Sequence, residues 1–355
     1  MELRDLGWDD FFAAHHAAAA RPELVPGRVV AEHRDLYRVA TAEGERPARL
    51  SGRLRHHAAA RGDLPAVGDW VLLDAPDAEG AAVVHEVLPR RSRFSRGAAG
   101  QRTEEQVVAA NVDTVWVVAA LDAPPGLRRI ERYLALAWES GALPAVLLSK
   151  ADLAADPAGA AREVEGVAPG VPVHALSALT GEGMEALEPY LRARSTIALL
   201  GPSGAGKSTL INRLAGEELL RTGAVRQGDA KGRHTTTHRQ LVPLPGGALI
   251  VDTPGMRELQ LWDAGEGLQD AFAEVEERAA ACRFADCDHA GEPGCAVAEA
   301  VERGELDPGR VAGYRKLLRE QEFQDRKLDA RARSEENRRV RSVTRELRDH
   351  PKYRR

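Results

Sequence analysis

The pattern of apolar and polar positions divides the chain into segments of three kinds. Between residues 27 and 96 apolar and polar positions alternate in short runs, separated by glycine, proline and aspartate. Such runs are typical of β-strands. From residue 112 to 252 longer apolar runs alternate with helical patterns, and after about residue 260 the pattern is helical. The sequence therefore predicts a small all-β segment, an α/β segment and a helical C-terminal part.

The all-β segment holds four or five strand-like runs, which predict a small barrel, with an OB-fold as the leading candidate. Residues 1–26 precede it as a leader that we expect to be partly disordered. The barrel segment is rich in arginine: Arg49, Arg53, Arg55, Arg61, Arg90, Arg91, Arg93 and Arg96. A basic face on an OB-fold typically binds nucleic acid, and the alternative is a solvated surface on an arginine-rich chain.

The α/β segment is predicted to form a parallel sheet covered on both faces, because its apolar runs are continuous rather than alternating. Between the first two runs, Ile130, Tyr133, Leu134 and Ala137 recur at helical spacing, which predicts a helix over residues 128–140 with one apolar face. The runs are 112–121, 144–150, 171–176, 195–200 and 247–252.

A phosphate-binding motif follows the fourth of these runs. The segment GPSGAGKST matches the P-loop pattern GxxxxGKS and is followed by an amphipathic helix. Its glycines allow backbone N–H groups to surround an anion, Lys207 reaches the terminal phosphates and Ser208 can bind magnesium. The alternative is a glycine turn that binds nothing, and a P-loop alone does not separate a GTPase from an ATPase or a kinase. The motif comprises Gly201, Pro202, Ser203, Gly204, Ala205, Gly206, Lys207, Ser208 and Thr209.

Three further motifs follow apolar runs and favour a guanine nucleotide. In DTPG, Asp252 can hold magnesium through water and the N–H of Gly255 can sense a γ-phosphate. In SKAD (149–152), Asp152 can accept from the two N–H donors that distinguish guanine from adenine, while the stem of Lys150 covers the base. The segment SAL offers backbone N–H groups to the guanine O6, chiefly that of Ala178 between Ser177 and Leu179.

Together these motifs predict a GTPase, and a P-loop ATPase or kinase acting on a small molecule remains the alternative enzyme. Their order is unusual, because the base-recognition motifs SKAD and SAL precede the P-loop and DTPG comes last. A sheet tolerates such a circular permutation when the reconnected ends lie close together. In this order DTPG leads directly into the C-terminal part.

The chain resembles the circularly permuted GTPase family of the ribosome small-subunit-dependent GTPase A (RsgA, also called YjeQ). The resemblance covers the barrel, the permuted order, the switch segment GRHTTTH (232–238) and a cysteine/histidine module after DTPG. It implies that the partner is the small (30S) ribosomal subunit with its rRNA, and that GTP hydrolysis governs release at a late assembly step. One departure is Ser149, where the family's motif begins with Asn. The loss of an amide that bridges base and P-loop is expected to weaken nucleotide affinity.

The switch segment supplies candidate catalytic groups besides Lys207. Thr235 or Thr236 is the natural magnesium ligand beside Ser208; spacing does not choose between them, and we take Thr236. Met256 follows DTPG, and a thioether cannot orient water, so His234 is the candidate for that role. The alternative is that His234 is a solvated loop histidine or one that contacts RNA. A nucleotide-gated RNA-binding module with incidental hydrolysis is the non-enzymatic alternative.

All three cysteines lie in one window, with the spacing CxxxxCxHxxxxxC formed by Cys282, Cys287, His289 and Cys295. Three thiolates and one imidazole are a complete tetrahedral set for one structural zinc ion, so we expect Zn²⁺ in addition to GTP or GDP and Mg²⁺. The alternative is three buried cysteines beside a chance histidine.

Length and charge complete the expectations. A chain of 355 residues suggests two or three domains, and the net charge of −5 is uneven. Residues 331–355 hold ten Lys/Arg and four Asp/Glu, a net +6 that leaves −11 for residues 1–330, so the tail suits a polyanion. The first residues are acidic and no apolar run reaches the length of a membrane helix, so we expect a cytoplasmic, monomeric protein without a membrane partner. The expected parts are 1–26 leader, 27–100 barrel, 105–262 permuted GTPase domain, 263–330 zinc-binding helical module and 331–355 basic tail.

Overall fold

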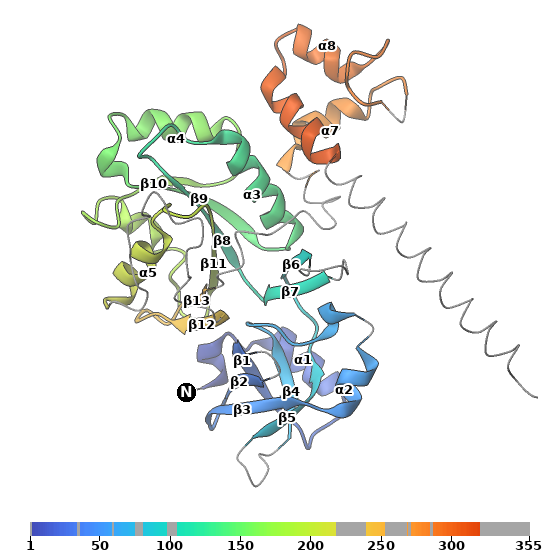
Figure 1. Cartoon of the computed structure of the whole chain (residues 1–355), viewed down its shortest axis with the longest axis vertical. Coiled ribbons are helices and arrows are strands. Elements are labelled where there is room, and N and C mark those ends of the chain that lie inside the picture. Colours follow the sequence, from blue (N-terminus) through green and yellow to red (C-terminus); the bar gives the residue numbers. More distant parts are fainter. Residues whose placement is uncertain are drawn as a thin grey trace, which may run out of the picture. The chain divides into compact units, whose positions relative to one another are not determined.

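The structure is a computed structural model that describes residues 2–33, 36–58, 60–74, 81–97, 105–217, 239–252, 268, 271–284 and 287–319. These residues form two compact units, and the chain passes from the larger to the smaller one between Glu276 and Glu277. The larger unit contains every strand of the described chain (Figure 1). Within the described ranges, no helix has both the length and the apolar character needed to cross a membrane.

A closed barrel of five strands forms the first part of the larger unit (Figure 1). The strand order is β1-β2-β3-β5-β4, and β1 closes the barrel by pairing with β4 as well as β2. Alternate side chains fill the interior, among them Val29, Val39, Val71 and Val84. This confirms the predicted barrel. The elements are β1 (Val25–His33), β2 (Leu36–Thr41), β3 (Gly44–Leu50), α2 (Gly52–His57), η2 (Arg61–Asp63), β4 (Trp70–Leu73) and β5 (Ala82–Val87).

The N-terminal residues are ordered against the barrel, so the expectation of a partly disordered leader is wrong for their described part. They form η1 (Leu3–Leu6) and α1 (Asp10–Ala18). The ring centroids of Trp8 and Trp70 are 4.7 Å apart, and the side chain of Phe12 is 2% exposed. These residues are ordered because their aromatic rings bury a large apolar surface against the barrel. The alanine-rich sequence around the rings does not indicate this packing.

The α/β part of the larger unit is a mostly parallel sheet of order β10-β9-β8-β11-β13-β12, in which only the edge strand β12 runs antiparallel. Its core contains Trp116, Leu147, Ile197 and Ile250. The predicted apolar runs are thereby confirmed as strands. The elements are β8 (Thr114–Ala120), α3 (Leu127–Glu139), β9 (Leu143–Ser149), η3 (Ala151–Leu153), α4 (Pro157–Glu165), β10 (Val173–Ala175), η4 (Met184–Leu187), β11 (Thr196–Leu200), α5 (Lys207–Ala215), β12 (Arg239–Pro243) and β13 (Leu249–Asp252).

The barrel and the α/β sheet are joined edge to edge. Strand β1 pairs antiparallel with β12, with Ala31 opposite Gln240, so one set of strands runs from the barrel into the α/β sheet. A two-stranded ribbon of β6 (Arg93–Gly97) and β7 (Glu105–Ala110) connects the two parts along the chain. The sequence patterns predicted both parts but not this shared edge.

The smaller unit is helical. Helix α7 (Ala273–Ala279) crosses from one unit into the other, and α8 (Ala296–Glu302) follows the cysteine segment. Residues 308–319 form a further helix that buries Val311, Tyr314 and Leu317, as the apolar spacing predicts. The basic tail at 331–355 lies outside the described residues.

Candidate nucleotide site and metal centre

The P-loop connects β11 to α5 in a conformation that requires glycine. Gly201 and Gly206 have φ of 151° and 84°, which L side chains rarely adopt. A Cβ atom on Gly201 would lie 2.3 Å from the carbonyl oxygen of Val118 in β8. The loop therefore rests directly on the neighbouring strand, and the first turn of α5 follows at Lys207.

The side chain of Lys207 lies against the backbone of the P-loop. The Lys207 Nζ donates to the carbonyl oxygens of Gly201 and Pro202, both at 2.7 Å. Ser208 and Thr209 follow in the first turn of α5, where backbone N–H groups lack partners within the helix. A glycine-lined turn, an ammonium group and a helix N-terminus suit an anionic phosphate chain and its magnesium ion.

The base-recognition segments leave the sheet at the same edge as the P-loop. Ala120 of β8 is opposite Ser149 of β9, and the next N–H along, that of Leu121, donates to the Ser149 carbonyl at 2.8 Å. The Ala151 N–H in turn donates to the Leu176 carbonyl at 3.1 Å, which fastens SKAD to the segment that leads into SAL. Asp152 is exposed in η3, Ser177 is buried, Ala178 half-buried and Leu179 exposed.

Ser149 fastens the base-recognition turn to the P-loop. Its side chain is buried, and its Oγ donates to the carbonyl oxygen of Ala205 at 2.7 Å. A hydroxyl thus still contacts the P-loop in place of the amide. The expected weakening of nucleotide affinity by the loss of that amide stays a prediction. The hydroxyl of Ser149 reaches the carbonyl because the P-loop lies directly beside β9's end.

One cavity of about 530 Å³ is lined by both kinds of segment. Lys150 from SKAD and the P-loop residues Pro202, Ser203, Gly204 and Ala205 line it together. The remaining wall comes from the end of β8 and the start of α3, including Asp122, Arg129 and Tyr133. Tyr133 was predicted only as part of the apolar face of that helix, and neither Asp122 nor Arg129 was predicted as a site residue. Asp122 directly follows the first apolar run, just as Asp252 ends the last one. Its place at the end of a strand could therefore have identified Asp122 as a candidate site residue.

Four predicted site residues lie outside the described residues: His234, Thr235, Thr236 and Gly255. Asp252 is described at the end of β13, where it is opposite Gln240. Strand β13 pairs in parallel with β11, the strand that leads into the P-loop. Asp252 at the end of β13 therefore lies at the same edge of the sheet as the P-loop.

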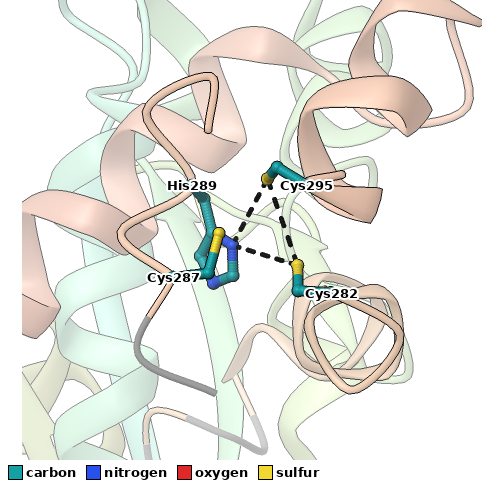
Figure 2. Close-up of side chains that lie close together, drawn as sticks. All are labelled: Cys282, Cys287, His289 and Cys295. Carbon is teal, nitrogen blue, oxygen red and sulfur yellow. Dashed lines mark hydrogen bonds between the residues drawn. The ribbon is translucent and has the colours of Figure 1, made fainter. Parts of the chain in front are cut away.

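The cysteine segment of the smaller unit forms a compact cluster (Figure 2). Ligand atoms of Cys282, Cys287, His289 and Cys295 all lie within 4.8 Å of one another. The Nδ1 atom of His289 lies 3.6 Å from the Cys282 Sγ and 3.7 Å from the Cys295 Sγ, which are themselves 4.0 Å apart. Tetrahedral thiolate ligands of one zinc ion are roughly 3.8 Å apart, so the donor set fits a metal ion. Nδ1, rather than Nε2, faces the thiols.

The arginines of the barrel segment do not share one environment. Arg90 pairs with the buried carboxylate of Asp69 at 2.7 Å, and Arg91 pairs with Asp9 at 2.6 Å. Five of the other side chains are exposed: Arg49 on β3, Arg53 and Arg55 on α2, Arg61 on η2 and Arg93 on β6. The exposed arginines therefore extend from β3 through α2 and η2 to β6, and their binding of nucleic acid stays a prediction.

Similarity to known proteins identifies the family of this chain. The RsgA GTPase family model matches residues 87–262. A relative from Opitutus terrae, "Small ribosomal subunit biogenesis GTPase RsgA", is 51% identical over 348 residues, which cover 95% of this chain and 95% of that protein. The chain belongs to the RsgA GTPase family.

Solved structures agree with the family assignment. YjeQ from Thermotoga maritima matches with a TM-score of 0.63 and 31% identity, over 84% of this chain and 98% of that one. YloQ, described as a circularly permuted GTPase, shares the fold with a TM-score of 0.59 at 23% identity, over 86% of this chain and 97% of that one. As an RsgA-family protein the chain is a GTPase, for which guanine nucleotide and Mg²⁺ are implied, and the ATPase or kinase alternative is not favoured.

Proposed function

We propose that this RsgA-family chain binds GTP in the site formed by the P-loop, SKAD, SAL and DTPG, and hydrolyses it to GDP in a late step of small-subunit assembly. The observation that carries the proposal is the Ser149 to Ala205 bond at 2.7 Å beside the shared cavity, because it joins base recognition to phosphate binding. The parallel strands support this proposal, because β9, β10, β11 and β13 end at one edge of the sheet although the motifs that follow them are permuted along the chain.

The residues divide the work by their chemistry. Asp152 accepts from the guanine N1–H and N2–H, the Lys150 stem covers the base and the Ala178 N–H faces O6. The P-loop amides and Lys207 bind the phosphates and stabilise the charge that develops during transfer. Ser208 and Thr236 would hold Mg²⁺, with Asp252 acting through water, and that ion would neutralise phosphate charge. Gly255 senses the γ-phosphate, and His234 orients the attacking water.

The proposed partner is the small (30S) ribosomal subunit with its rRNA, as the names of the relatives indicate for those proteins. The barrel at 27–100 and the tail at 331–355 would contact rRNA, the domain at 105–262 would hydrolyse GTP, and the module at 263–330 would bind one structural Zn²⁺. We propose a monomeric, cytoplasmic protein whose release from the subunit follows subunit-stimulated hydrolysis.

The deciding experiment measures GTP turnover by the full chain with and without purified 30S subunits. We expect slow turnover alone and strong stimulation by 30S subunits, in the manner of GTPases whose loop is ordered by a partner. Unchanged turnover at saturating 30S subunits would contradict the proposed function and favour a binding module whose hydrolysis is incidental.

Nucleotide competition tests the base-recognition part separately. GDP should displace a labelled guanine nucleotide, whereas ADP at the same concentration should not. Asp152→Asn exchanges one acceptor oxygen for an amide that donates, so it should relax the preference for guanine over xanthine while the fold remains intact. Equal displacement by GDP and ADP would contradict the assignment of SKAD.

A further inference from the structure

We infer that Asp122 is a positioning residue that holds Lys150 across the guanine base. The Asp122 Oδ2 accepts from the Lys150 Nζ at 2.5 Å, and both residues line the cavity that the P-loop also lines. The inference rests on the proposed function, since it assigns a specificity role within that nucleotide site.

The sheet brings the two residues together. Asp122 and Lys150 follow adjacent parallel strands, in which Ala120 is opposite Ser149. The Leu121 N–H donates to the Ser149 carbonyl at 2.8 Å, immediately before both side chains. The pair is therefore fixed by strand register, unlike a pair that forms between two long side chains on an open surface.

The backbone of Lys150 supports the same role. Its φ of 58° is left-handed, a conformation that a non-glycine residue adopts when the surrounding structure requires it. The ammonium group is then fastened at one end by Asp122, while the Ser149 hydroxyl fastens the preceding residue to the P-loop. With both ends held, the aliphatic stem between them has few conformations left to lose when a base packs on it.

A simple surface ion pair is the competing explanation. The side chains of Lys150 and Asp122 are 31% and 49% exposed, and exposed pairs commonly contribute little to stability. The two explanations predict opposite signs for nucleotide binding. A carboxylate near an anionic nucleotide repels it, so its removal should tighten binding if charge alone matters. If Asp122 positions Lys150, its removal should weaken binding.

The test is a double-mutant cycle in the full chain, with the Kd for GDP measured by a fluorescent GDP analogue and direct competition. Asp122→Ala should raise the Kd for GDP about threefold to tenfold, and the loss should appear in KM for GTP rather than in kcat. In a Lys150→Met background, Asp122→Ala should cause no further loss of affinity, because the ammonium group that it positions is gone and only its repulsion of the nucleotide remains. Asp122→Glu keeps the carboxylate and should restore part of the affinity.

A matched control separates positioning from charge and from folding. Glu163→Ala removes one exposed carboxylate from α4 in the same domain and should leave the Kd unchanged. Urea unfolding should confirm that Asp122→Ala remains folded. Unchanged or tighter GDP binding in Asp122→Ala would overturn the inference, as would an equal effect of Asp122→Ala with and without Lys150. If the unmodified chain did not prefer GDP to ADP, the proposed function itself would fail instead.

Discussion

At the scale of single residues, the site depends on short polar contacts between segments far apart in the sequence. Ser149 and Ala205 are separated by the whole of α4 and β10, yet one hydroxyl joins them. A side-chain hydroxyl has one proton to donate, and the Ala119 carbonyl lies at 3.3 Å as a second, weaker acceptor. The single proton of the Ser149 hydroxyl therefore serves the P-loop contact, whereas an amide has a second N–H to donate.

This geometry predicts the effect of removing the hydroxyl. Ser149→Ala leaves the buried Ala205 carbonyl without its side-chain donor, which should lower the free energy of unfolding by about 1 kcal/mol. Because the P-loop is then held less firmly before nucleotide binds, GDP binding should weaken by at most about fivefold. The measurement is the Kd for GDP by titration. Ser149→Asn is the matched variant: it restores a donor to the P-loop and should bind GDP at least as tightly as the unmodified chain. Identical affinities for all three proteins would show that the bridge does not contribute to binding.

At the scale of secondary-structure elements, the cysteine segment and α8 depend on one another. Cys295 is the N-cap of α8, and its Sγ accepts from the Ala298 N–H at 3.3 Å. His289 has a left-handed φ of 53°, and its ring centroid lies 6.1 Å from that of Tyr314 in the following helix. The cluster thus joins the segment, α8 and the last described helix within the smaller unit.

Metal removal should therefore loosen these elements first. Chelation of the full chain should raise amide hydrogen exchange across residues 287–302 and leave β8 and β11 protected, because the bound ion supplies folding free energy to a region poor in apolar residues. Cys295→Ser should reproduce the effect without chelator and release the metal ion in a colorimetric zinc assay. Uniform exchange changes in both units would contradict a local role for the metal.

Helix α2 is the second element that carries a prediction. Ser51 caps it by accepting from the Leu54 N–H at 3.1 Å, and its arginines Arg53 and Arg55 are exposed. Exposed arginines on one helix are suited to contact the phosphate groups of RNA. Such contacts release counterions, so the affinity for RNA falls as the salt concentration rises.

Charge reversal on α2 should weaken binding to 30S subunits. Arg53→Glu with Arg55→Glu should lower affinity at least tenfold at low salt and reduce the slope of affinity against salt by about one per lost contact. The measurement is a sedimentation or filter-binding titration at several salt concentrations. Arg162→Glu in α4 is the control and should leave the slope unchanged. An equal effect of both changes would indicate general charge attraction rather than a defined surface.

At the scale of the larger unit, a buried arginine joins the barrel to the N-terminal residues and to the linker that precedes β8. Arg28 is 1% exposed; its Nε donates to the Gly68 carbonyl at 3.1 Å and one Nη to the Asn111 carbonyl at 3.0 Å. It also donates to the Leu6 carbonyl, and its guanidinium lies over the Trp70 ring at 5.7 Å. Burial lowers the pKa of Arg28 to about 10, with Asp113 and Asp69 opposing the shift, so the group stays charged at neutral pH.

Loss of this contact should destabilise the whole unit. Arg28→Ala leaves the Leu6 and Asn111 carbonyls without the Arg28 donor, while the Gly68 carbonyl keeps the Asn111 Nδ2 donor, and should reduce the free energy of unfolding by about 2 to 4 kcal/mol in urea titrations. Arg28→Lys keeps the charge but has no planar fork, so it should recover only part of the loss. Arg38→Ala on the exposed face of β2 is the control, expected to stay within about 0.5 kcal/mol. Similar stabilities for Arg28→Ala and Arg38→Ala would contradict the role of Arg28.

The sequence by itself determined the elements and the chemistry of their ends. Continuous apolar runs gave the strands, the spacing around Ile130 gave α3, and motif identity gave the P-loop, SKAD and the Cys/His set, because local periodicity and residue type are properties of short segments. These same patterns placed polar residues at strand ends, where parallel strands open onto one edge.

Only the tertiary structure decided which segments meet. The pairing of β1 with β12, the burial of Arg28, the aromatic packing of Trp8 and the contact of Asp122 with Lys150 all join residues distant in sequence. A sequence does not distinguish an arginine or aspartate that is exposed to solvent from one that is buried against a carbonyl group. The partner of such a side chain depends on strand register, which composition does not determine. The local sequence therefore determined the elements and their candidate site residues, whereas contacts across the sheet determined which of these residues lie together.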